Sequence, residues 1–266
     1  MEECPNCGAS LADTLTTKQQ QRTIIEPPKL LLSVPKIQTA YDLMQFKFDI
    51  PKIDSFLLPL ATAGGLLCVV GYKEANLLLT RLCVRALLPA KYGGLDSPYV
   101  IVVDAGNKSD IYQTVNFARQ YGMDFRKALN RIIVTRTFTI HQLKSIILSC
   151  ELTKAIQKYQ AGIVVIPGLL DLFDDPNIKQ KEAKRVIGSI MKSLDATSSK
   201  LLVITSVQES NKYTKLIASS GAATKKQIIR LTNAKYRRRL TAELYNQGDR
   251  KNISLTEKEL KLVPKR

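Results

Sequence analysis

Short apolar runs alternate with longer amphipathic stretches between residues 51 and 247. The short runs are rich in Val and Ile and have the length of buried strands, whereas the longer stretches have helical length. The expected strands are Leu66–Val70, Tyr99–Asp104, Arg131–Thr135, Gly162–Ile166 and Leu201–Thr205, and the expected helices are Leu77–Leu88, Asp110–Tyr121, Ile140–Lys158 and Ile178–Ala196. Continuous apolar strands that alternate with helices predict an α/β fold, with a mainly parallel sheet and helices on both faces.

The pattern changes toward both ends of the chain. Gln227–Thr232 and Leu240–Leu244 predict a C-terminal β-hairpin around a basic turn, and they complete a compact core that we place at 51–247. Residues 1–29 are polar and predict a flexible arm, residues 30–50 predict a linker with a short helix near Tyr41–Phe46, and residues 248–266 predict a basic mobile tail. No apolar run reaches the roughly 18 residues that span a bilayer, so no membrane partner is expected.

The charge of the chain favours a polyanionic partner. The formal net charge is +17, and residues 207–266 hold 15 Lys and Arg against 5 Asp and Glu. A local excess of this size is typical of a nucleic-acid-binding face, although a generally basic solubilising surface remains the alternative.

The cysteines form two groups. Cys4 and Cys7 have the spacing of a zinc knuckle, but zinc needs about four ligands and neither a second pair nor a nearby histidine follows. We therefore expect no cofactor, with zinc at Cys4 and Cys7 only if two chains share it. Cys68, Cys83 and Cys150 lie in apolar stretches and are expected to be buried thiols. Nothing suggests disulfides, and the N-terminus is unlike a signal peptide, so a cytoplasmic location is expected.

A turn after the first strand has the position of a phosphate-binding P-loop but not its residues. The motif G-x-x-x-x-G-K-[ST] would put its second Gly at Glu74, its Lys at Ala75 and its Ser or Thr at Asn76. Ala75 supplies no cation for the phosphates, and Asn76 is a poor substitute for the hydroxyl ligand of Mg²⁺. Glu74 places a carboxylate where phosphate oxygens would lie, so like charges would repel.

Longer segments carry a resemblance to a known family. They are Leu82-Cys-Val-Arg-Ala-Leu-Leu-Pro89, Tyr121-Gly-Met-Asp124, Ala128-Leu-Asn-Arg-Ile-Ile-Val-Thr-Arg-Thr-Phe138 and Leu201-Leu-Val-Ile-Thr-Ser-Val207. Their order resembles the RecA/RadA strand-exchange recombinases, the archaeal RadA branch most closely, from about Ile37 to Glu243. The resemblance implies a RecA-like P-loop NTPase core.

The departures from the family are as informative as the matches. Gly106 stands where the family has its water-activating Glu, and Pro167 replaces the Asp that ends the Walker B strand. Ser206 and Val207 replace the family's Asn-Gln pair. Because phosphoryl transfer depends on these groups acting together, their joint loss predicts a degenerate, inactive ATPase fold.

The resemblance also implies a DNA-binding region. The family grips DNA through two loops, whose counterparts here are about Asp171–Lys184 and Ser206–Lys226, the second including Tyr213. The candidate DNA-binding residues are Lys179, Lys181, Lys212, Lys215, Lys225, Lys226, Arg237, Arg238 and Arg239. No sequence-reading helix is evident, so we expect contacts to phosphates, on single-stranded DNA and without sequence preference. A solvated charged surface is the alternative for each lysine.

The segment Ile37-Gln-Thr-Ala40 resembles the family's F-x-x-A motif, with Ile37 in place of Phe and Ala40 matching. It implies a partner interface, either with a RadA-type recombinase or with a second copy of this chain. The combined interpretation is an inactive recombinase paralog with an accessory role in recombination and repair. The alternatives are a protein-interaction scaffold without a DNA role and, more remotely, an ATPase with an unconventional loop.

Overall fold

A computed structural model describes residues 45–57, 60–61, 64–219, 226–233, 239–246 and 249–263. Its strands are β1 (Gln45–Phe46), β2 (Leu60–Ala61), β3 (Gly65–Val70), β4 (Val100–Asp104), β5 (Ile132–Arg136), β6 (Ile163–Ile166), β7 (Leu202–Val207), β8 (Lys226–Asn233), β9 (Arg239–Asn246) and β10 (Asp249–Thr256). Its helices are α2 (Pro51–Asp54), α3 (Lys73–Ala86), α4 (Ile111–Gln120), α5 (Phe125–Asn130), α6 (Ile140–Leu148), α7 (Cys150–Tyr159), α8 (Gln180–Ser198), α9 (Thr214–Ser219) and α10 (Glu257–Lys261). The mixed α/β composition predicted from the sequence is therefore confirmed.

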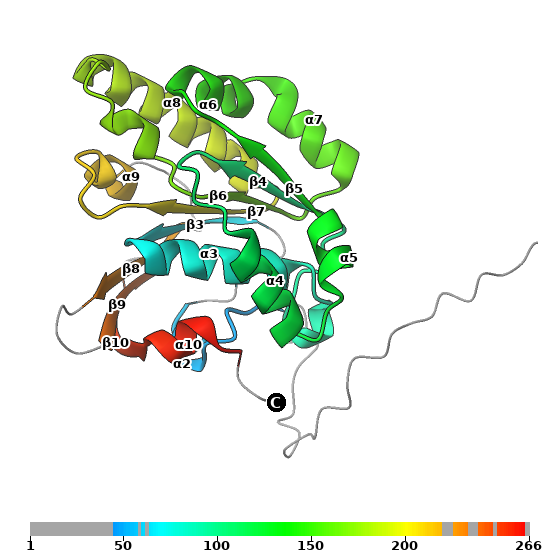
Figure 1. Cartoon of the computed structure of the whole chain (residues 1–266). Helices are drawn as coiled ribbons and strands as arrows, with labels where there is room; N and C mark the ends of the chain where they lie inside the picture. Colours follow the sequence, from blue (N-terminus) through cyan, green and yellow to red (C-terminus); the bar gives the residue numbers. More distant parts are fainter. Residues whose placement is uncertain are drawn as a thin grey trace, which may run out of the picture. The chain divides into compact units, whose positions relative to one another are not determined.

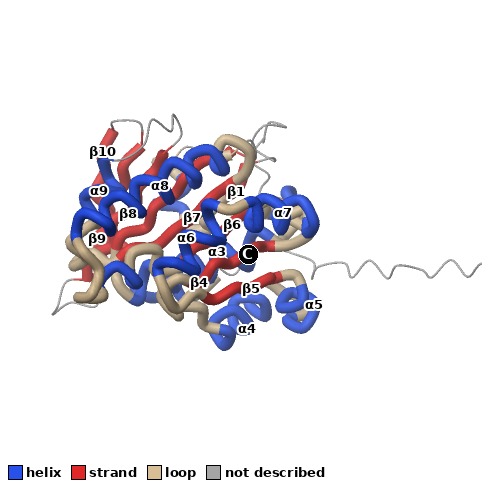
Figure 2. Tube along the Cα trace, turned by 90° about the horizontal axis from the view of Figure 1, so that it is seen from above, coloured by secondary structure: helices blue, strands red, loops and turns tan. Residues whose placement is uncertain are grey.

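One eight-stranded sheet organises these elements, in the order β10-β9-β8-β3-β7-β6-β4-β5 (Figure 2). The six strands from β8 to β5 are parallel, whereas β9 and β10 join antiparallel. Since the parallel strands run in one direction, they all end at the same side of the sheet, which we call the carboxyl edge. The hairpin predicted near the C-terminus is confirmed as β8 and β9.

The helices cover both faces of the sheet, with α3, α4 and α10 on one side and α6, α7 and α8 on the other (Figure 1). Alternate residues of β3 explain this arrangement. Leu67 and Val69 pack with the buried side chains of α3, while Leu66 and Cys68 pack with those of α6 and α8. A strand that is buried along its whole length thus supports two hydrophobic cores at once.

The stretch predicted as one long helix, Ile140–Lys158, is instead two helices that meet at Ser149. The backbone of Ser149 is extended, with φ −79° and ψ 171°, and its side chain accepts a hydrogen bond from the Glu151 N–H. A serine that caps the next helix ends the previous one, although the apolar periodicity continues through it. Cys150 follows this break and is exposed, so the expectation of a buried thiol is wrong for Cys150.

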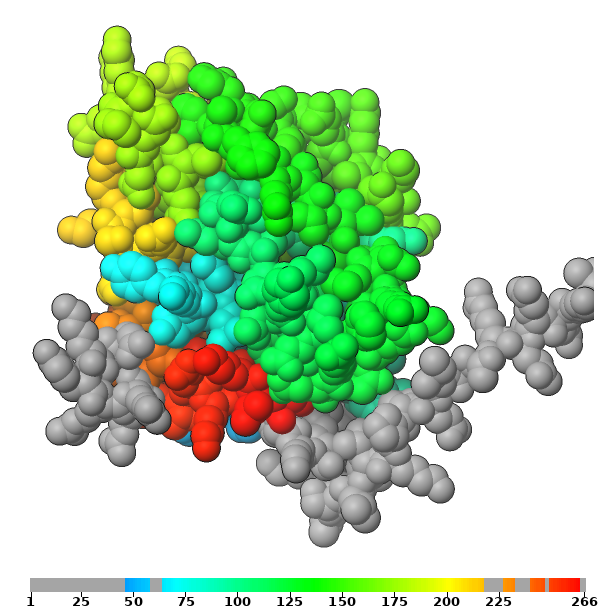
Figure 3. All heavy atoms as spheres, in the orientation of Figure 1, coloured from blue at the N-terminus to red at the C-terminus, as the bar shows by residue number. Residues whose placement is uncertain are grey.

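The expectation of a mobile tail at 248–266 is also wrong for its described part. Residues 249–256 pair with β9 as strand β10, and α10 follows with a capping box between Thr256 and Glu259. Leu255 and Leu260 are fully buried. In the space-filling view the C-terminal residues, drawn in red, lie against α3 and α4 (Figure 3). The core therefore extends beyond residue 247.

The core also begins earlier than predicted. Gln45–Phe46 form strand β1 rather than the end of a short helix, and Phe46, Phe48 and Ile50 are buried. The rest of the expected linker, residues 30–44, and the expected arm, residues 1–29, lie outside the described residues.

Two fully buried arginines on α3 hold the segment around Asp49 and the C-terminal helix α10 against the core. Arg81 donates to the carbonyl oxygens of Asp49 (2.8 Å), Glu259 (2.6 Å), Leu260 and Leu262 (both 3.3 Å). Arg85 lies one helical turn later, and its Nη1 is 3.3 Å from the Asp49 carboxylate. A buried guanidinium is stable only when its donors and its charge are satisfied. The carbonyls satisfy Arg81, whereas Arg85 Nη1 has the charge of Asp49 nearby but no hydrogen bond among the described residues.

Candidate functional site

The sequence positions singled out for nucleotide chemistry gather at the carboxyl edge. The connections that follow β3, β4, β6 and β7 all start there, because these four strands are parallel neighbours in the sheet. In open α/β sheets this edge is where ligands bind. The sequence thus places its degenerate positions at the side of the sheet where a functional site is expected.

The connection between β3 and α3 is too short to enclose a phosphate. Strand β3 ends at Val70 and helix α3 begins at Lys73, so only Gly71 and Tyr72 lie between them. Glu74 is already in the first helical turn, and Ala75 is fully buried. A P-loop holds phosphates with the N–H groups of a longer glycine-rich loop, and these two residues do not provide one. The loss therefore affects the backbone as well as the side chains.

Asn76, Ser206 and Pro167 lie next to one another, as the resemblance implies for the positions they occupy. The Ser206 hydroxyl donates to Asn76 Oδ1 at 2.7 Å and accepts from the Gly168 N–H at 2.9 Å. The Ala105 N–H donates to the Pro167 carbonyl at 3.1 Å, which joins the turn after β4 to the turn after β6. These polar groups satisfy one another, so the connections are closed by internal hydrogen bonds.

A carboxylate fills the space beside Gly106. A Cβ atom added to Gly106 would lie 2.6 Å from Asp171 Oδ2 and 3.2 Å from the Gly168 Cα. The same oxygen accepts from Gln208 at 3.1 Å and pairs with Lys108 Nζ at 3.2 Å, and the Asp171 side chain is only 11% exposed. A larger side chain at position 106 would require this arrangement to move.

Asp104, at the end of β4, has a structural role. Its fully buried carboxylate accepts from the backbone N–H groups of Lys108 (2.8 Å) and Ser109 (3.2 Å), and it lies 3.5 Å from Arg136 Nε. These contacts fix the turn that leads into α4. The carboxylate is fully buried and is held by these backbone donors and the arginine.

Metal ligation and the buried Cys83 thiol bear on the chemistry that the described residues can perform. They contain no group of three or more His, Cys, Asp and Glu side chains that could hold a metal ion. Burial raises the pKa of Cys83 to about 12, so its thiol stays protonated and is a poor nucleophile. The candidate zinc ligands Cys4 and Cys7 lie outside the described residues.

Four of the nine candidate DNA-binding residues lie together at the carboxyl edge. Lys179 and Lys181 stand at the start of α8, after β6, while Lys212 and Lys215 stand before and within α9, after β7. All four are exposed. Tyr213 is not part of this surface, because it is 2% exposed and its ring packs edge-on against Phe173. It therefore cannot stack on a base.

Lys226 does not belong to this group, because its backbone lies at the far end of the sheet. It pairs with Leu66 at the start of β3, so it lies at the opposite end of β8, roughly 23 Å along the strand. Arg239 begins β9 at the carboxyl edge, next to Leu240, which pairs with Asn233 of strand β8. Lys225, Arg237 and Arg238, as well as Ile37 and Ala40 of the expected partner interface, lie outside the described residues.

Sequence reasoning missed three further cations at the same edge. Lys73 follows β3, Lys108 follows β4, and Arg136 is the last residue of β5. The sequence did contain a signal for these three cations, because each follows or ends a strand that was itself predicted. Acidic side chains accompany them, but Asp171 is engaged by Lys108 and Gln208, and Asp174 accepts from Asn211 at 2.9 Å.

No protein-family model matches the chain, and no curated protein matches it either. Within the described parts of the chain, every helix is too short or too polar to cross a bilayer.

Proposed function

We propose that this chain is a catalytically inactive paralog of the RecA/RadA recombinases, with a RecA-like core that no longer turns over ATP. The observation that carries the proposal is the meeting of Asn76, Ser206, Pro167 and Gly106 at one edge. These positions are distant in sequence, and the family resemblance selects them independently of the structure. Their contact is expected if the resemblance is correct, but parallel neighbouring strands of any open α/β sheet also bring their connections to one edge. The order of the matching segments along the chain therefore supports the proposal beside it.

The short connection before α3 and the filled space beside Gly106 support the inactive state. Phosphoryl transfer needs a phosphate-binding loop, a Mg²⁺ ligand and a group that positions water. The two-residue connection before α3 offers no loop, and Asp171 fills the space beside Gly106. We accordingly assign the protein a binding role rather than an enzymatic one.

The binding role that we propose is an accessory one in homologous recombination and repair. The chain would bind DNA, mainly single-stranded and without sequence preference, and it would assemble with a recombinase or with its own copies. The exposed cations Lys179, Lys181, Lys212 and Lys215 at the carboxyl edge support this proposal, together with the net charge of +17. Exposed lysines suit phosphate contacts, which position a strand without reading its bases.

Fluorescence anisotropy with a labelled single strand tests the DNA role. If about 6–10 phosphates of the single strand are neutralised, affinity should fall roughly 300- to 16,000-fold between about 50 and 200 mM salt. Replacing Lys179, Lys181 and Lys212 together by Gln should weaken binding and flatten the slope of log K against log salt by about 2, since each phosphate contact contributes roughly 0.7 on single strands.

A matched control separates a located site from a general charge effect. Lys154, Lys158 and Lys200 are exposed and precede the amino ends of β6 and β7, toward the opposite edge of the sheet. Changing these three to Gln removes the same charge and should leave the slope nearly unchanged. Equal losses in both triple variants would contradict the placement of the site. Absence of binding at about 50 mM salt would favour an interaction scaffold without a DNA role.

A further inference from the structure

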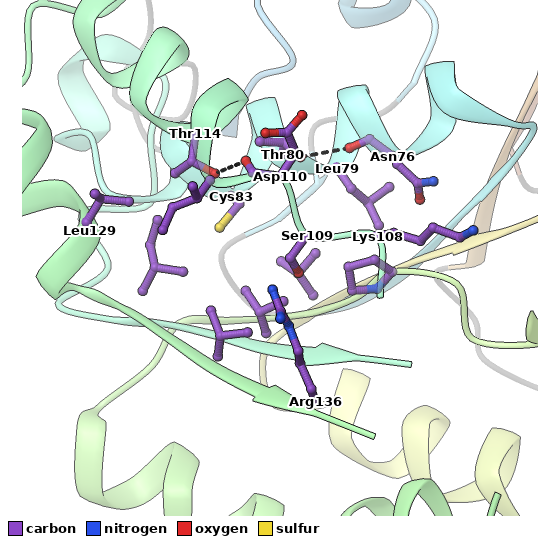
Figure 4. A pocket seen from close by; sticks show the side chains of 16 residues that line it. Asn76, Leu79, Thr80, Cys83, Lys108, Ser109, Asp110, Thr114, Leu129 and Arg136 are labelled. Atoms are coloured by element: carbon purple, nitrogen blue, oxygen red, sulfur yellow. Dashed lines mark hydrogen bonds between the residues drawn. The ribbon is translucent and has the colours of Figure 1, made fainter. Parts of the chain in front are cut away.

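A second feature of the same core is a cavity of about 340 Å³ between the sheet and helices α3 and α4 (Figure 4). Val102, Val134 and Val165, from three neighbouring strands, form its floor, and Leu79 of α3 and Leu129 of α5 form its walls. None of the positions selected for DNA binding lines it. Its lining is mainly apolar, which is typical of sites for small organic ligands.

The cavity is open because the edge of the sheet is incompletely covered on this side. Strand β5 pairs only with β4 among the described strands, and the connection of residues 105–110 sets α4 apart from the strand ends. Val134 is consequently 48% exposed and Ile111, at the mouth, is 59% exposed. Apolar surface gathered around a hollow usually marks a binding site rather than a chance exposure.

Some polar groups at the mouth of the cavity keep hydrogen-bond donors that the described residues do not use. The hydroxyls of Thr80 and Thr114 donate to backbone carbonyls of their own helices and are not free. The Ser109 Oγ atom is buried and has no hydrogen-bond partner among the described residues. The side chain of Arg136 reaches from β5 into the space below Ser109, whereas Lys108 extends away from both (Figure 4) and pairs with Asp171.

The carboxylates near the mouth do not exhaust these donors. Asp104 faces Arg136 only through Nε, at 3.5 Å, which leaves the two terminal nitrogens of the guanidinium. Asp171 takes one of the three donors of Lys108. Asp110 turns its carboxylate to the N-terminus of α4 and accepts from the N–H groups of Tyr112 and Gln113. The mouth therefore presents the spare donors of Arg136 and the Ser109 hydroxyl above an apolar floor.

We propose that this cavity binds a small amphipathic monocarboxylate, with its apolar body on the valine floor and its carboxylate at Arg136 and Ser109. Arginine and a hydroxyl are well matched to a carboxylate. The volume lies at the lower end of ligand sites, which suits a short alkyl or aryl acid. A triphosphate does not fit this description, because the floor offers no donors to a phosphate chain.

Titration calorimetry on the full chain with octanoate tests the proposal directly. Octan-1-ol and octylamine serve as ligands of the same length with neutral and positive heads. We expect saturable binding in the order octanoate, octanol, octylamine. Methyl NMR should show shifts at Leu79, Val102 and Val134, which would locate the ligand in the cavity.

Two variants separate recognition of the head from recognition of the body. Arg136→Gln should weaken octanoate binding by about tenfold or more and leave octanol binding unchanged, since it removes a charge-assisted hydrogen bond. The fold should tolerate it, because Asp104 keeps its two backbone donors. Val134→Trp, on a half-exposed strand position, should fill the cavity and weaken octanoate and octanol alike. Arg126→Gln, on exposed α5 outside the lining, is the charge control and should bind like wild type.

The contrary results are equally specific. No saturable octanoate binding overturns the proposal and would leave an apolar side chain of a partner protein as the occupant of the cavity. Equal affinities of the Arg136→Gln and Arg126→Gln variants for octanoate, or equal binding of octylamine and octanoate, also overturn it. None of these outcomes depends on whether the chain binds DNA.

Discussion

The buried Arg81 provides the sharpest test of how the chain ends are held in the core. Replacing it with Met keeps much of its length and removes the guanidinium. The carbonyls of Glu259, Leu260, Leu262 and Asp49 would then lose a donor, and no water can take the place of a group that is 0% exposed. Breaking a buried charge interaction costs about 3–5 kcal/mol.

This cost should be visible in urea unfolding. With an m-value of about 2–3 kcal/mol/M, a loss of about 3–5 kcal/mol moves the midpoint down by about 1–2 M. Hydrogen exchange should increase first in residues 256–262, because Arg81 is the buried anchor of α10, while exchange in the central strand β4 should follow global unfolding only.

Lys52 offers a control on the same C-terminal segment. Its ammonium donates to the Ser254 carbonyl at 2.9 Å and pairs with Glu259 at 2.8 Å, but its side chain is 49% exposed. Lys52→Met should therefore cost less than about 1 kcal/mol. If Arg81→Met unfolds within about 1 kcal/mol of wild type, or no differently from Lys52→Met, the anchoring role of the guanidinium is refuted.

Three further predictions follow from the chain. Purified protein should hydrolyse no ATP above background, and Ala75→Lys should not restore turnover but lower stability, since position 75 is fully buried; turnover in a malachite-green assay would contradict this. Ala40→Glu should leave the fold intact, as judged by circular dichroism, yet abolish assembly with a recombinase partner or with itself in light scattering and co-purification; unchanged assembly would make the segment a simple linker. Burial opposes ionisation of Glu259, but hydrogen bonds from Lys52 and Thr256 outweigh it and hold the pKa below its ordinary 4.5. Glu259→Gln should thus be less stable than wild type by under about 1 kcal/mol at neutral pH. This difference in stability should vanish as pH falls below 4.5 through the lowered pKa. If urea midpoints show a difference that does not depend on pH, the charge of Glu259 is not the cause of the difference.

The sequence predicts the central strands well because each is a short, continuous apolar run. It fails at Ser149, where the apolar period continues across a break that only a local cap reveals. It also fails at β10, whose residues are exposed except for Leu255 and the partly buried Ile253, so the strand lacks the pattern of a buried one. Edge strands commonly carry charge, which hides them from hydrophobic periodicity.

The candidate site was predictable only in part, for a related reason. The positions Asn76, Gly106 and Pro167 could be selected from the order of segments along the chain. The role of Asp171 could not, because it depends on how the turn after β6 lies against Gly106. The cavity next to α3 is likewise a property of three strands and three helices together, and no single segment of the sequence encodes it.

The packing around Gly106 bears on how this protein could change during evolution. A glutamate at position 106 would meet the carboxylate of Asp171 at once, and removing Asp171 would leave Lys108 and Gln208 without their shared acceptor. A lysine at position 75 would place its ammonium in the hydrophobic core, because this position is fully buried. Each single change toward the P-loop motif or the family's glutamate would therefore cost stability while the other groups that phosphoryl transfer needs are still missing. The packing of this edge thus couples these positions, so that they can change without loss of stability only together with their neighbours.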